Sequence, residues 1–335
     1  MKTDLSEKLF QGKGKPEEVI SDGDCYVLKV TYNDTPYIVK GRKLIIEQWM
    51  PTANNQNVFL SLVKEIGSIH QDYFLSKLGS TVNEHIGEAV EIGHAIVTDI
   101  NKLYLYIEIA FKYEGEILLS AGDVSEVCKV MKESLEALSL LHKAGIPHLN
   151  FGSNSLIHNK KTKLINLGKS FDHSTQSNIN EALKAIDKTL DSLMKENSPP
   201  EILKWCKGII PAEFDFILGA IDVYCWSMCF YKLLTGKTRS ELETEAETFK
   251  YDRESYEEFM KKTKEALDQI ELKDQNQKEV VVEVIMKSLS YNPSERPSVA
   301  DILTKMKGCS ITAGEELKEV TGVKEQLFGN TSLHK

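Results

Sequence analysis

The stretch that decides the fold is HLNFGSNSLIHNKKTKLINLGKS, residues 148–170. A strong helical pattern leads directly into it, because apolar residues recur on one face between Asp123 and Pro147. Asp123 and Glu126 have the spacing of a capping box at the start of this helix, and Gly145 with Pro147 ends it. The sequence therefore predicts a helix that delivers the chain to a loop starting at the histidine of this stretch.

The chain changes character on either side of this helix. Before it, segments rich in β-branched and aromatic residues read as strands over 17–23, 25–40, 89–97 and 102–111, with a turn signal at 33–36. One amphipathic helix is expected among them, from about Val58 to Leu78. After it, helical patterns dominate near 220–235, 253–270 and 276–290, and the residues after Gly308 are polar and loosely patterned.

Six separated landmarks resemble protein kinase motifs and follow one another in the kinase order. They are Tyr37-Ile38-Val39-Lys40, which resembles V-A-I-K; the loop 148–155, which resembles H-R-D-L-K-P-E-N; Asn166-Leu167-Gly168, which resembles D-F-G; Pro199-Pro200-Glu201, which resembles A-P-E; Asp222 at the start of an apolar helix; and Asn292-Pro293 with Arg296-Pro297, which resemble D-P-x-x-R-P. The resemblance covers about residues 18–307.

This resemblance implies an α+β, two-lobed protein-kinase-like fold. The small lobe, rich in β-strands and with one main helix, is expected at about 18–111, and the larger helical lobe at about 112–307. Residues 1–17 would be an N-terminal extension and 308–335 a C-terminal tail.

The best-preserved positions have architectural roles in kinases. By resemblance, Glu201 and Arg296 make a partly buried ion pair, and Asp222 holds the loop after His148 by its backbone. His148 and Leu167 occupy two positions of the hydrophobic stack between the lobes, Leu75 is a candidate third, and Gly168 keeps the glycine of D-F-G. These residues predict a folded body and do not by themselves predict catalysis.

The positions that do chemistry in kinases are altered. Asn150 replaces the carboxylate of the catalytic loop and cannot take a proton at neutral pH, and loss of a general base typically costs about 10²–10⁴ in rate. Asn166 and Ser155 replace the two metal-binding positions, and neutral oxygens are poorer Mg²⁺ ligands than carboxylates. Gly152 replaces the loop lysine. Lys169 is either a substitute cation or an ordinary surface residue.

The nucleotide-binding positions are altered as well. The pattern G-x-G-x-x-G falls on residues 21–26, which retain only Gly23 and add the carboxylates Asp22 and Asp24. Lys40 is kept, but its glutamate partner falls on Gln71, with Glu65 as a second candidate.

The expected adenine pocket is narrower than in kinases. Ile38 replaces a small alanine, and Leu28 and Ile157 would complete a self-filled apolar sandwich with it. The hinge is expected through Ile107, Glu108 and Ile109, or two residues away. We therefore expect weak or no binding of ATP and Mg²⁺, and no other cofactor or metal.

The segment from Asn166 to Glu201 would correspond to the activation segment. Leu149 stands where many kinases carry a phosphate-clasping arginine. The hydroxyls in this segment that are candidates for phosphorylation are Ser174, Thr175, Ser177, Thr189 and Ser198. Residues 180–196 have helical spacing, which predicts a helix that covers the substrate cleft.

Composition narrows the compartment and the partners. The chain has 335 residues and a formal charge of −9, with scattered basic residues, which argues against a nucleic-acid partner. Its six cysteines lack zinc-site spacing, and Cys225 and Cys229 are expected to be buried in an apolar run. No segment reads as a membrane span or a secretory signal, so the expected compartment is the cytoplasm.

Three functional interpretations follow from these residues. The first is a pseudokinase, a kinase-shaped binding, scaffolding or allosteric module whose partner is another protein, with an active kinase as one candidate. The second is a low-activity ATP-dependent serine/threonine protein kinase with a non-standard active site. The third is a phosphotransferase acting on a small molecule, against which the features around Glu201 and Arg296 argue because they are typical of protein kinases.

Overall fold

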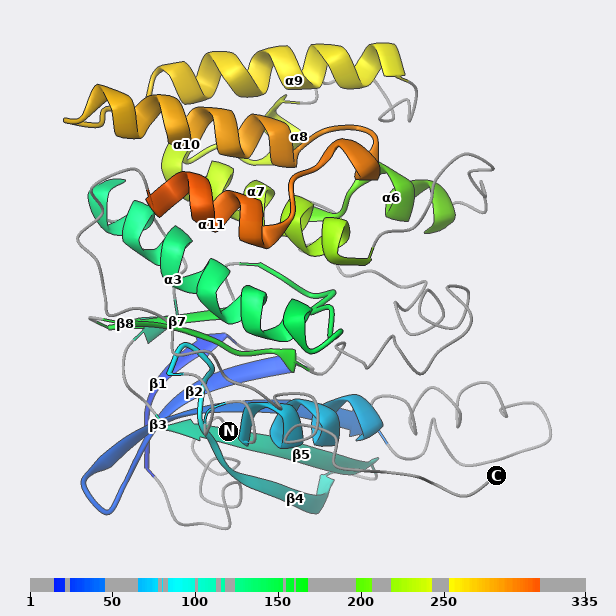
Figure 1. Ribbon diagram of the computed structural model, residues 1–335. Helices are drawn as coiled ribbons and strands as arrows, with labels where there is room; N and C mark the ends of the chain where they lie inside the picture. The colour runs from blue at the N-terminus through cyan, green and yellow to red at the C-terminus, as the bar shows by residue number, and fades with distance from the viewer. Residues whose placement is uncertain are drawn as a thin grey trace. The chain divides into compact units, whose positions relative to one another are not determined.

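The chain divides into two compact units, Met1–Glu116 and Ile117–Lys335, and each is described by itself. The computed structural model describes residues 15–21, 25–45, 66–77, 80, 84–99, 102–112, 116–117, 124–152, 155–159, 161–167, 197–206, 218–242 and 253–307. The first unit is a sheet with a helix, and the second is mostly helical (Figure 1). The division falls after Glu116, a few residues beyond the boundary that the sequence suggested at 111.

The first unit contains a five-stranded antiparallel sheet in the order β1-β2-β3-β5-β4. Its strands are β1 (Lys15–Ser21), β2 (Cys25–Tyr32), β3 (Thr35–Ile45), β4 (Ala89–Asp99) and β5 (Lys102–Lys112). Their content of β-branched and aromatic residues suits a pleated, half-buried surface. Asn33 and Asp34 form the turn between β2 and β3 with φ values of 48° and 59°, the left-handed pair that tight hairpins favour.

The register of the ladders assigns each side chain to one face of the sheet, because residues directly opposite each other share a face. Ile38 lies opposite Lys29 and Phe111, and this face also carries Lys40. Leu28 lies opposite Val39 and therefore points to the other face. The expectation that Leu28 and Ile38 line one pocket is wrong.

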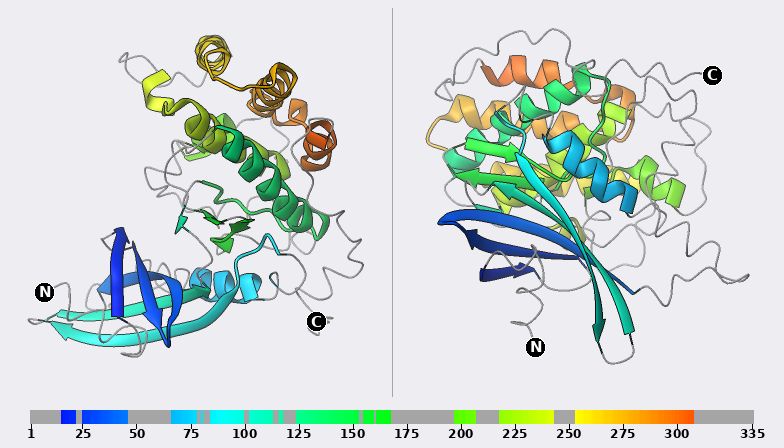
Figure 2. Two further views of the ribbon diagram at one scale, coloured as in Figure 1. Left: turned by 90° about the vertical axis from the view of Figure 1, so that its left-hand side faces the viewer. Right: turned by 90° about the horizontal axis from the view of Figure 1, so that it is seen from below.

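The face that carries Leu28 has its own apolar cluster. The cluster consists of Tyr26, Leu28, Val30, Val39, Tyr106 and Ala110. The opposite face, with Lys40, packs against a helix that spans residues 66–77 (Figure 2). The sequence predicted this helix over 58–78, and residues 58–65 and 78 lie outside the described part of the chain.

The ring of Tyr26 fills the space beside Gly41, which lies directly opposite it in the ladder between β2 and β3. A Cβ atom added to Gly41 would lie 2.1 Å from the ring of Tyr26, so only glycine fits beneath that ring. The Tyr26 hydroxyl donates a 2.6 Å hydrogen bond to the buried carboxylate of Glu108. Burial, followed by the charge of Glu108, raises the pKa of Tyr26 far above its usual value, so this hydroxyl remains a donor.

Gly41→Ala is expected to lower the free energy of unfolding by about 1–3 kcal/mol, because the added methyl group overpacks the Tyr26 ring. Gly93→Ala, where an added Cβ meets nothing within 4 Å, is the matched control and should have little effect. Urea unfolding measures both variants. The Gly41 effect should shrink in a Tyr26→Ala background, and an equal loss in both backgrounds would contradict this packing.

The second unit is built around two long helices and a small sheet. Its first strand, β6 (Glu116–Ile117), begins at the last residue of the first unit. The elements that follow are α3 (Val124–Lys143), β7 (Leu156–Asn159), β8 (Lys161–Leu164), α6 (Pro200–Cys206), α7 (Leu218–Thr235), α8 (Arg239–Leu242), α9 (Arg253–Asp268), α10 (Gln275–Ser288), η6 (Pro293–Glu295) and α11 (Val299–Lys307). The sheet has the order β6-β7-β8. α3 packs on β8, α7 and α11, and α10 packs on α7, α9 and α11.

α7 is the central helix of this unit and is buried along almost its whole length. It lies against α3, α9 and α10 (Figure 2), which explains why its sequence is apolar on all sides. The predicted burial of Cys225 and Cys229 is confirmed, and both are free thiols. No helix in the described part of the chain is both long and apolar enough to cross a membrane.

The ion pair expected between Glu201 and Arg296 is present and fully buried. Arg296 donates two hydrogen bonds to the Glu201 carboxylate, of 2.6 and 2.9 Å, and both side chains are inaccessible to solvent. The same guanidinium also donates to the carbonyls of Ser290 and Ala220, at 2.8 and 3.1 Å. The pair therefore ties α6 to the start of α7 and to the end of α10.

Arg296→Met should lower the free energy of unfolding by about 3–5 kcal/mol, because it leaves the Glu201 carboxylate buried without its counter-ion. The matched control is Arg253→Met, whose i,i+4 pair with Glu257 is exposed, with relative side-chain accessibilities of 82% and 71%. The control should show no measurable change in urea unfolding. A similar loss in both variants would show that burial of the Glu201–Arg296 pair does not matter.

Candidate functional site

The loop after α3 is fixed by one buried carboxylate from α7. Asp222 accepts hydrogen bonds of 2.7 Å from the backbone N–H groups of His148 and Leu149 and one of 2.8 Å from Nε2 of His142. Leu149 has a φ of 58°, which is uncommon for a leucine, and its own amide and that of His148 both donate to Asp222. Asp222 thus holds the loop by its main chain, as the sequence predicted.

His148 connects this loop to the strand that precedes Asn166. It is fully buried, its Nδ1 accepts a 3.2 Å bond from the N–H of Asn150, and its Nε2 lies 3.0 Å from the carbonyl oxygen of Ile165. Because Nδ1 accepts, the network assigns the proton to Nε2, which donates to Ile165. His148 is therefore a neutral linker between two parts of the candidate site.

The two residues at the expected metal-binding positions, Asn166 and Ser155, are hydrogen-bonded to each other. The amide nitrogen of Asn166 donates a 3.4 Å hydrogen bond to Oγ of Ser155, and the Ser155 hydroxyl donates a 2.9 Å bond to the carbonyl of Asn150. Ser155 and Asn166 are both buried. Asn166 has a φ of 70°, a conformation that asparagine tolerates better than most residues. The fold therefore brings Asn150, Ser155 and Asn166 together, as the resemblance implied.

These residues do not fit a Mg²⁺ ion. Mg²⁺ is held in phosphate-binding sites by carboxylates, and Asn150, Ser155 and Asn166 supply none. Throughout the described residues, no group of three or more His, Cys, Asp or Glu side chains could hold a metal ion.

In the first unit, Lys40 forms an ion pair with Asp72. Lys40 Nζ lies 3.3 Å from Oδ2 of Asp72, whose other oxygen accepts a 3.4 Å bond from the Ser76 hydroxyl. The sequence placed Gln71 opposite Lys40, and this register is wrong by one residue. Asp72 and Gln71 lie three and four residues before the buried Leu75, and both spacings fall on one helix face, so the pattern could not separate them. Glu65 lies outside the described residues.

Residues 107–109 are not a hinge. They lie inside β5, where Ile107, Glu108 and Ile109 pair with β3 on one side and β4 on the other. Their backbone N–H and C=O groups are therefore committed to two ladders, and β5 continues to Lys112. The apolar run that suggested a hinge marks a central strand instead.

The remaining nucleotide candidates are buried or lie outside the described residues. Ile38 and Ile109 share the Lys40 face of the sheet and are almost fully buried. Ile157 is buried in β7 of the second unit. Gly23, Gly168 and Lys169 lie outside the described part of the chain. Leu75 in the first unit and His148 and Leu167 in the second are all buried.

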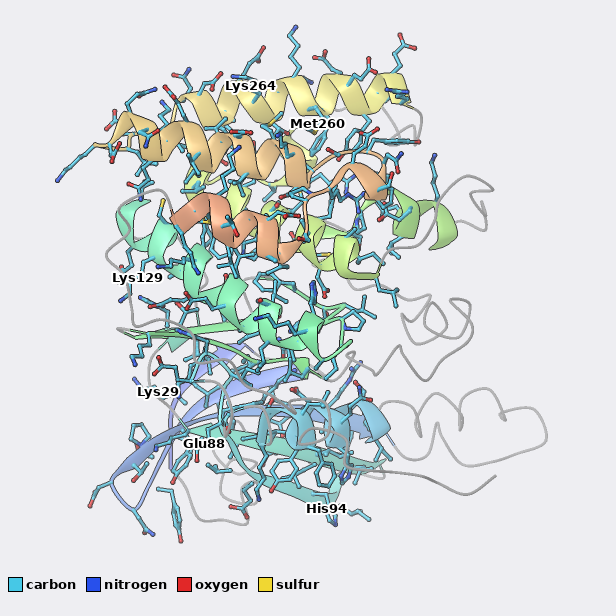
Figure 3. All side chains as sticks on the ribbon, viewed as in Figure 1. Lys29, Glu88, His94, Lys129, Met260 and Lys264 are labelled. Atoms are coloured by element: carbon cyan, nitrogen blue, oxygen red, sulfur yellow. The ribbon has the colours of Figure 1, made fainter. Side chains whose placement is uncertain are left out.

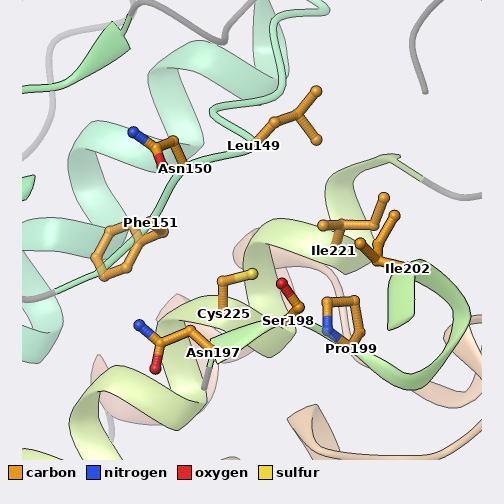
Figure 4. A pocket seen from close by; sticks show the side chains of 9 residues that line it. All are labelled: Leu149, Asn150, Phe151, Asn197, Ser198, Pro199, Ile202, Ile221 and Cys225. Carbon is orange, nitrogen blue, oxygen red and sulfur yellow. The ribbon is translucent and has the colours of Figure 1, made fainter. Parts of the chain in front are cut away.

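A small cavity of about 20 Å³ lies next to Asn150 in the second unit. In Figure 4, Leu149, Asn150 and Phe151 lie on one side of it, and Pro199 and Ile202 on the other. This volume holds about one water molecule. Leu149 contributes an apolar wall here, where a phosphate-clasping residue would need a cation.

Ser198, at the rim of this cavity, is the one candidate phosphorylation residue within the described part of the chain. It is buried, and its carbonyl oxygen accepts a 2.7 Å hydrogen bond from the buried guanidinium of Arg239. Phosphorylation of Ser198 in this conformation is therefore excluded by access. Residues 168–196, with the other candidate hydroxyls and the predicted helix at 180–196, lie outside the described residues.

Comparison with protein families identifies the class. The family model described as "Protein kinase domain" matches residues 89–306, from the start of β4 to the end of α11. The chain belongs to the protein kinase domain family and has the kinase fold, an N-terminal antiparallel sheet with a helix followed by a mostly helical region. Comparison with curated proteins gave no match.

The match begins after Lys40 and Asp72, so their place in this family rests on the structure. Sequence reasoning missed Asp72, His142 and the contact between Tyr26 and Glu108. The only available signal for Asp72 was its spacing of three residues from Leu75. His142 gave no signal, because nothing in a single sequence connects it to Asp222.

The buried thiols give a pH-dependent prediction. Burial raises the pKa of Cys229 to about 12 and also raises that of Cys225, whereas a cysteine in the unfolded chain titrates near about 8.5. Above this pH each thiol therefore loses its proton in the unfolded chain but keeps it in the folded protein. Each such thiol lowers the free energy of unfolding by up to about 1.4 kcal/mol per pH unit.

Cys229→Ala should therefore flatten the loss of stability between pH 8.5 and about 9.5, as measured by urea unfolding at several pH values. In the wild-type protein, brief treatment with iodoacetamide followed by peptide mass mapping should leave Cys128, Cys225 and Cys229 unmodified. Rapid alkylation of Cys229 in the folded protein would contradict its burial.

Proposed function

We propose that this protein kinase domain is catalytically impaired and acts as a binding and regulatory module for another protein, with an active kinase as the first candidate partner. The observation that carries the proposal is the contact between Asn166 and Ser155, in which the two metal positions satisfy each other through neutral groups. A site arranged in this way needs no ion to complete it.

The chemistry of phosphoryl transfer supports this proposal. The reaction requires metal ions on the phosphates, a positioned lysine and a carboxylate that orients the substrate hydroxyl. Asn150 can orient a hydroxyl but cannot accept its proton. Gly152 supplies no charge in place of the loop lysine. The base, both metal positions and the loop cation are therefore lost together in one loop system.

The architectural residues of the second unit are complete, which suits a role in binding. Asp222 holds the loop after α3, and the Glu201–Arg296 pair fixes α6. A net charge of −9 does not favour a nucleic-acid partner. A folded unit that does not transfer phosphate can still present a defined surface to another protein.

A low-activity protein kinase is the second candidate, and the ion pair between Lys40 and Asp72 favours it. The lysine that contacts phosphates in active kinases depends on an acid that positions it. Asp72 supplies such an acid, at 3.3 Å and almost fully buried. Lys40 is thus held as it would be for nucleotide binding.

A thermal-shift titration with ATP, with and without Mg²⁺, separates the two candidates. ATP at a free concentration of 100 times its Kd would raise the free energy of unfolding by about 2.7 kcal/mol, which is readily measured. We expect no Mg²⁺-dependent rise in Tm and no transfer of labelled phosphate to the protein itself or to a generic substrate protein.

Variants in each of the two units make this test decisive. Lys40→Met and Asn166→Ala should leave the background signal unchanged. Lys112→Met, an exposed lysine paired with Glu88 in the same unit as Lys40, is the matched control. A clear Mg-ATP shift with phosphate transfer that Lys40→Met abolishes and Lys112→Met preserves would establish the low-activity kinase instead.

A further inference from the structure

A groove among the described residues that is not part of the candidate site lies between α9 and α10. It has a volume of about 380 Å³, and Val282 and Met286 of α10 are its apolar residues. Its rim includes Lys264 and Asp268 from α9 and Lys278 and Glu283 from α10. Lys264 is labelled on α9 in Figure 3.

The rim charges largely neutralise one another. Lys264 pairs with Asp268 at 2.7 Å, and Lys287 pairs with Glu283 at 3.1 Å. Lys278 donates a 2.7 Å hydrogen bond to the carbonyl of Asp268 at the end of α9. A balanced rim of both signs around apolar residues does not select a polyanion. It suits the apolar face of an amphipathic helix that carries both acidic and basic residues.

The chain itself leads toward this groove. Lys305 in the last turn of α11 forms an ion pair with Glu283 on the groove rim, and α11 ends at Lys307. Residues 308–335 continue from that point. The chain between Gly308 and Leu317 can reach about 30 Å when extended, which is ample to enter a groove whose rim already contacts α11.

The sequence of this continuation has the required pattern. Over 315–328 it reads EELKEVTGVKEQLF, with apolar residues at Leu317, Val320, Val323, Leu327 and Phe328. At helical spacing these positions form one stripe, bordered by glutamates and lysines. Gly322 weakens the helix in isolation, so such a helix depends on a surface that receives its apolar stripe.

We propose that residues 315–328 form an amphipathic helix that docks in the groove between α9 and α10 of the same chain. Leu317, Val320, Leu327 and Phe328 would cover Val282 and Met286, and the glutamates and lysines beside the stripe would meet the mixed charges of the rim. The tail is then a built-in ligand of the helical unit, independent of whether the domain transfers phosphate.

Hydrogen exchange on the full chain tests the docking. The double variant Leu327→Ser with Phe328→Ser should increase amide exchange in residues 275–287 about tenfold or more, because the cover is lost. The double variant Lys318→Ser with Gln326→Ser, on the opposite side of the same helix, is the matched control and should leave that exchange unchanged. Equal exchange in wild-type protein and both variants would overturn the proposal.

A change on the groove side gives a reciprocal measurement. Met286→Glu, on the partly exposed side of α10, should raise exchange in residues 315–328 and speed tryptic cleavage at Lys318 and Lys324. A cooperative thermal transition close to that of the wild type confirms that this variant is folded. A folded Met286→Glu variant with unchanged exchange and cleavage in the tail would overturn the docking site even if the tail were helical.

A tail from a second copy of the chain is distinguished by how protection depends on protein concentration and by the molecular mass of the protein in solution. Protection of residues 275–287 that falls on dilution, together with a mass change from dimer to monomer in light scattering, would show tails exchanged between two copies and overturn docking within one chain. Protection that is independent of concentration, in a monomer, supports it.

Discussion

Asp222 is a carboxylate without access to solvent, and the arrangement of the second unit depends on how its charge is satisfied. A buried carboxylate is costly unless it accepts strong hydrogen bonds, and this one takes them from two successive backbone amides and from His142. The bonds to His148 and Leu149 require the chain to turn through a left-handed residue. Because Asp222 contacts the main chain, its bonds to the loop do not depend on the side chain at position 149.

The same logic applies to the other buried charge of this unit. Arg296 bonds the Glu201 carboxylate and also backbone carbonyls at the start of α7 and after α10. These two anchors fix the frame through groups that every residue possesses. The positions that would carry out phosphoryl transfer are therefore free to change, and Asn150, Gly152, Ser155 and Asn166 show that they have changed without loss of the surrounding geometry.

The order of elements, the anchor role of Asp222, the Glu201–Arg296 pair and the burial of Cys225 and Cys229 could be predicted from the sequence, because each depends on a motif or on a long apolar pattern. The partner of Lys40 could not, since residues three and four positions from Leu75 share a helix face. The prediction of which sheet face carries Leu28 depended on a glycine pattern that this chain largely lacks. A shift of one residue in the alignment moves every side chain of a strand to the other face. Nothing in the apolar run of β5 showed that β3 and β4 flank residues 107–109 on both sides.

This double pairing of β5 matters for chemical probes of the domain. A compound that imitates a nucleobase gains much of its specificity from edge-on hydrogen bonds to a strand with free donors and acceptors. Along Ile107, Glu108 and Ile109 those groups are already taken by neighbouring strands. A compound that relies on this recognition mode therefore cannot form edge-on hydrogen bonds along residues 107–109 of β5.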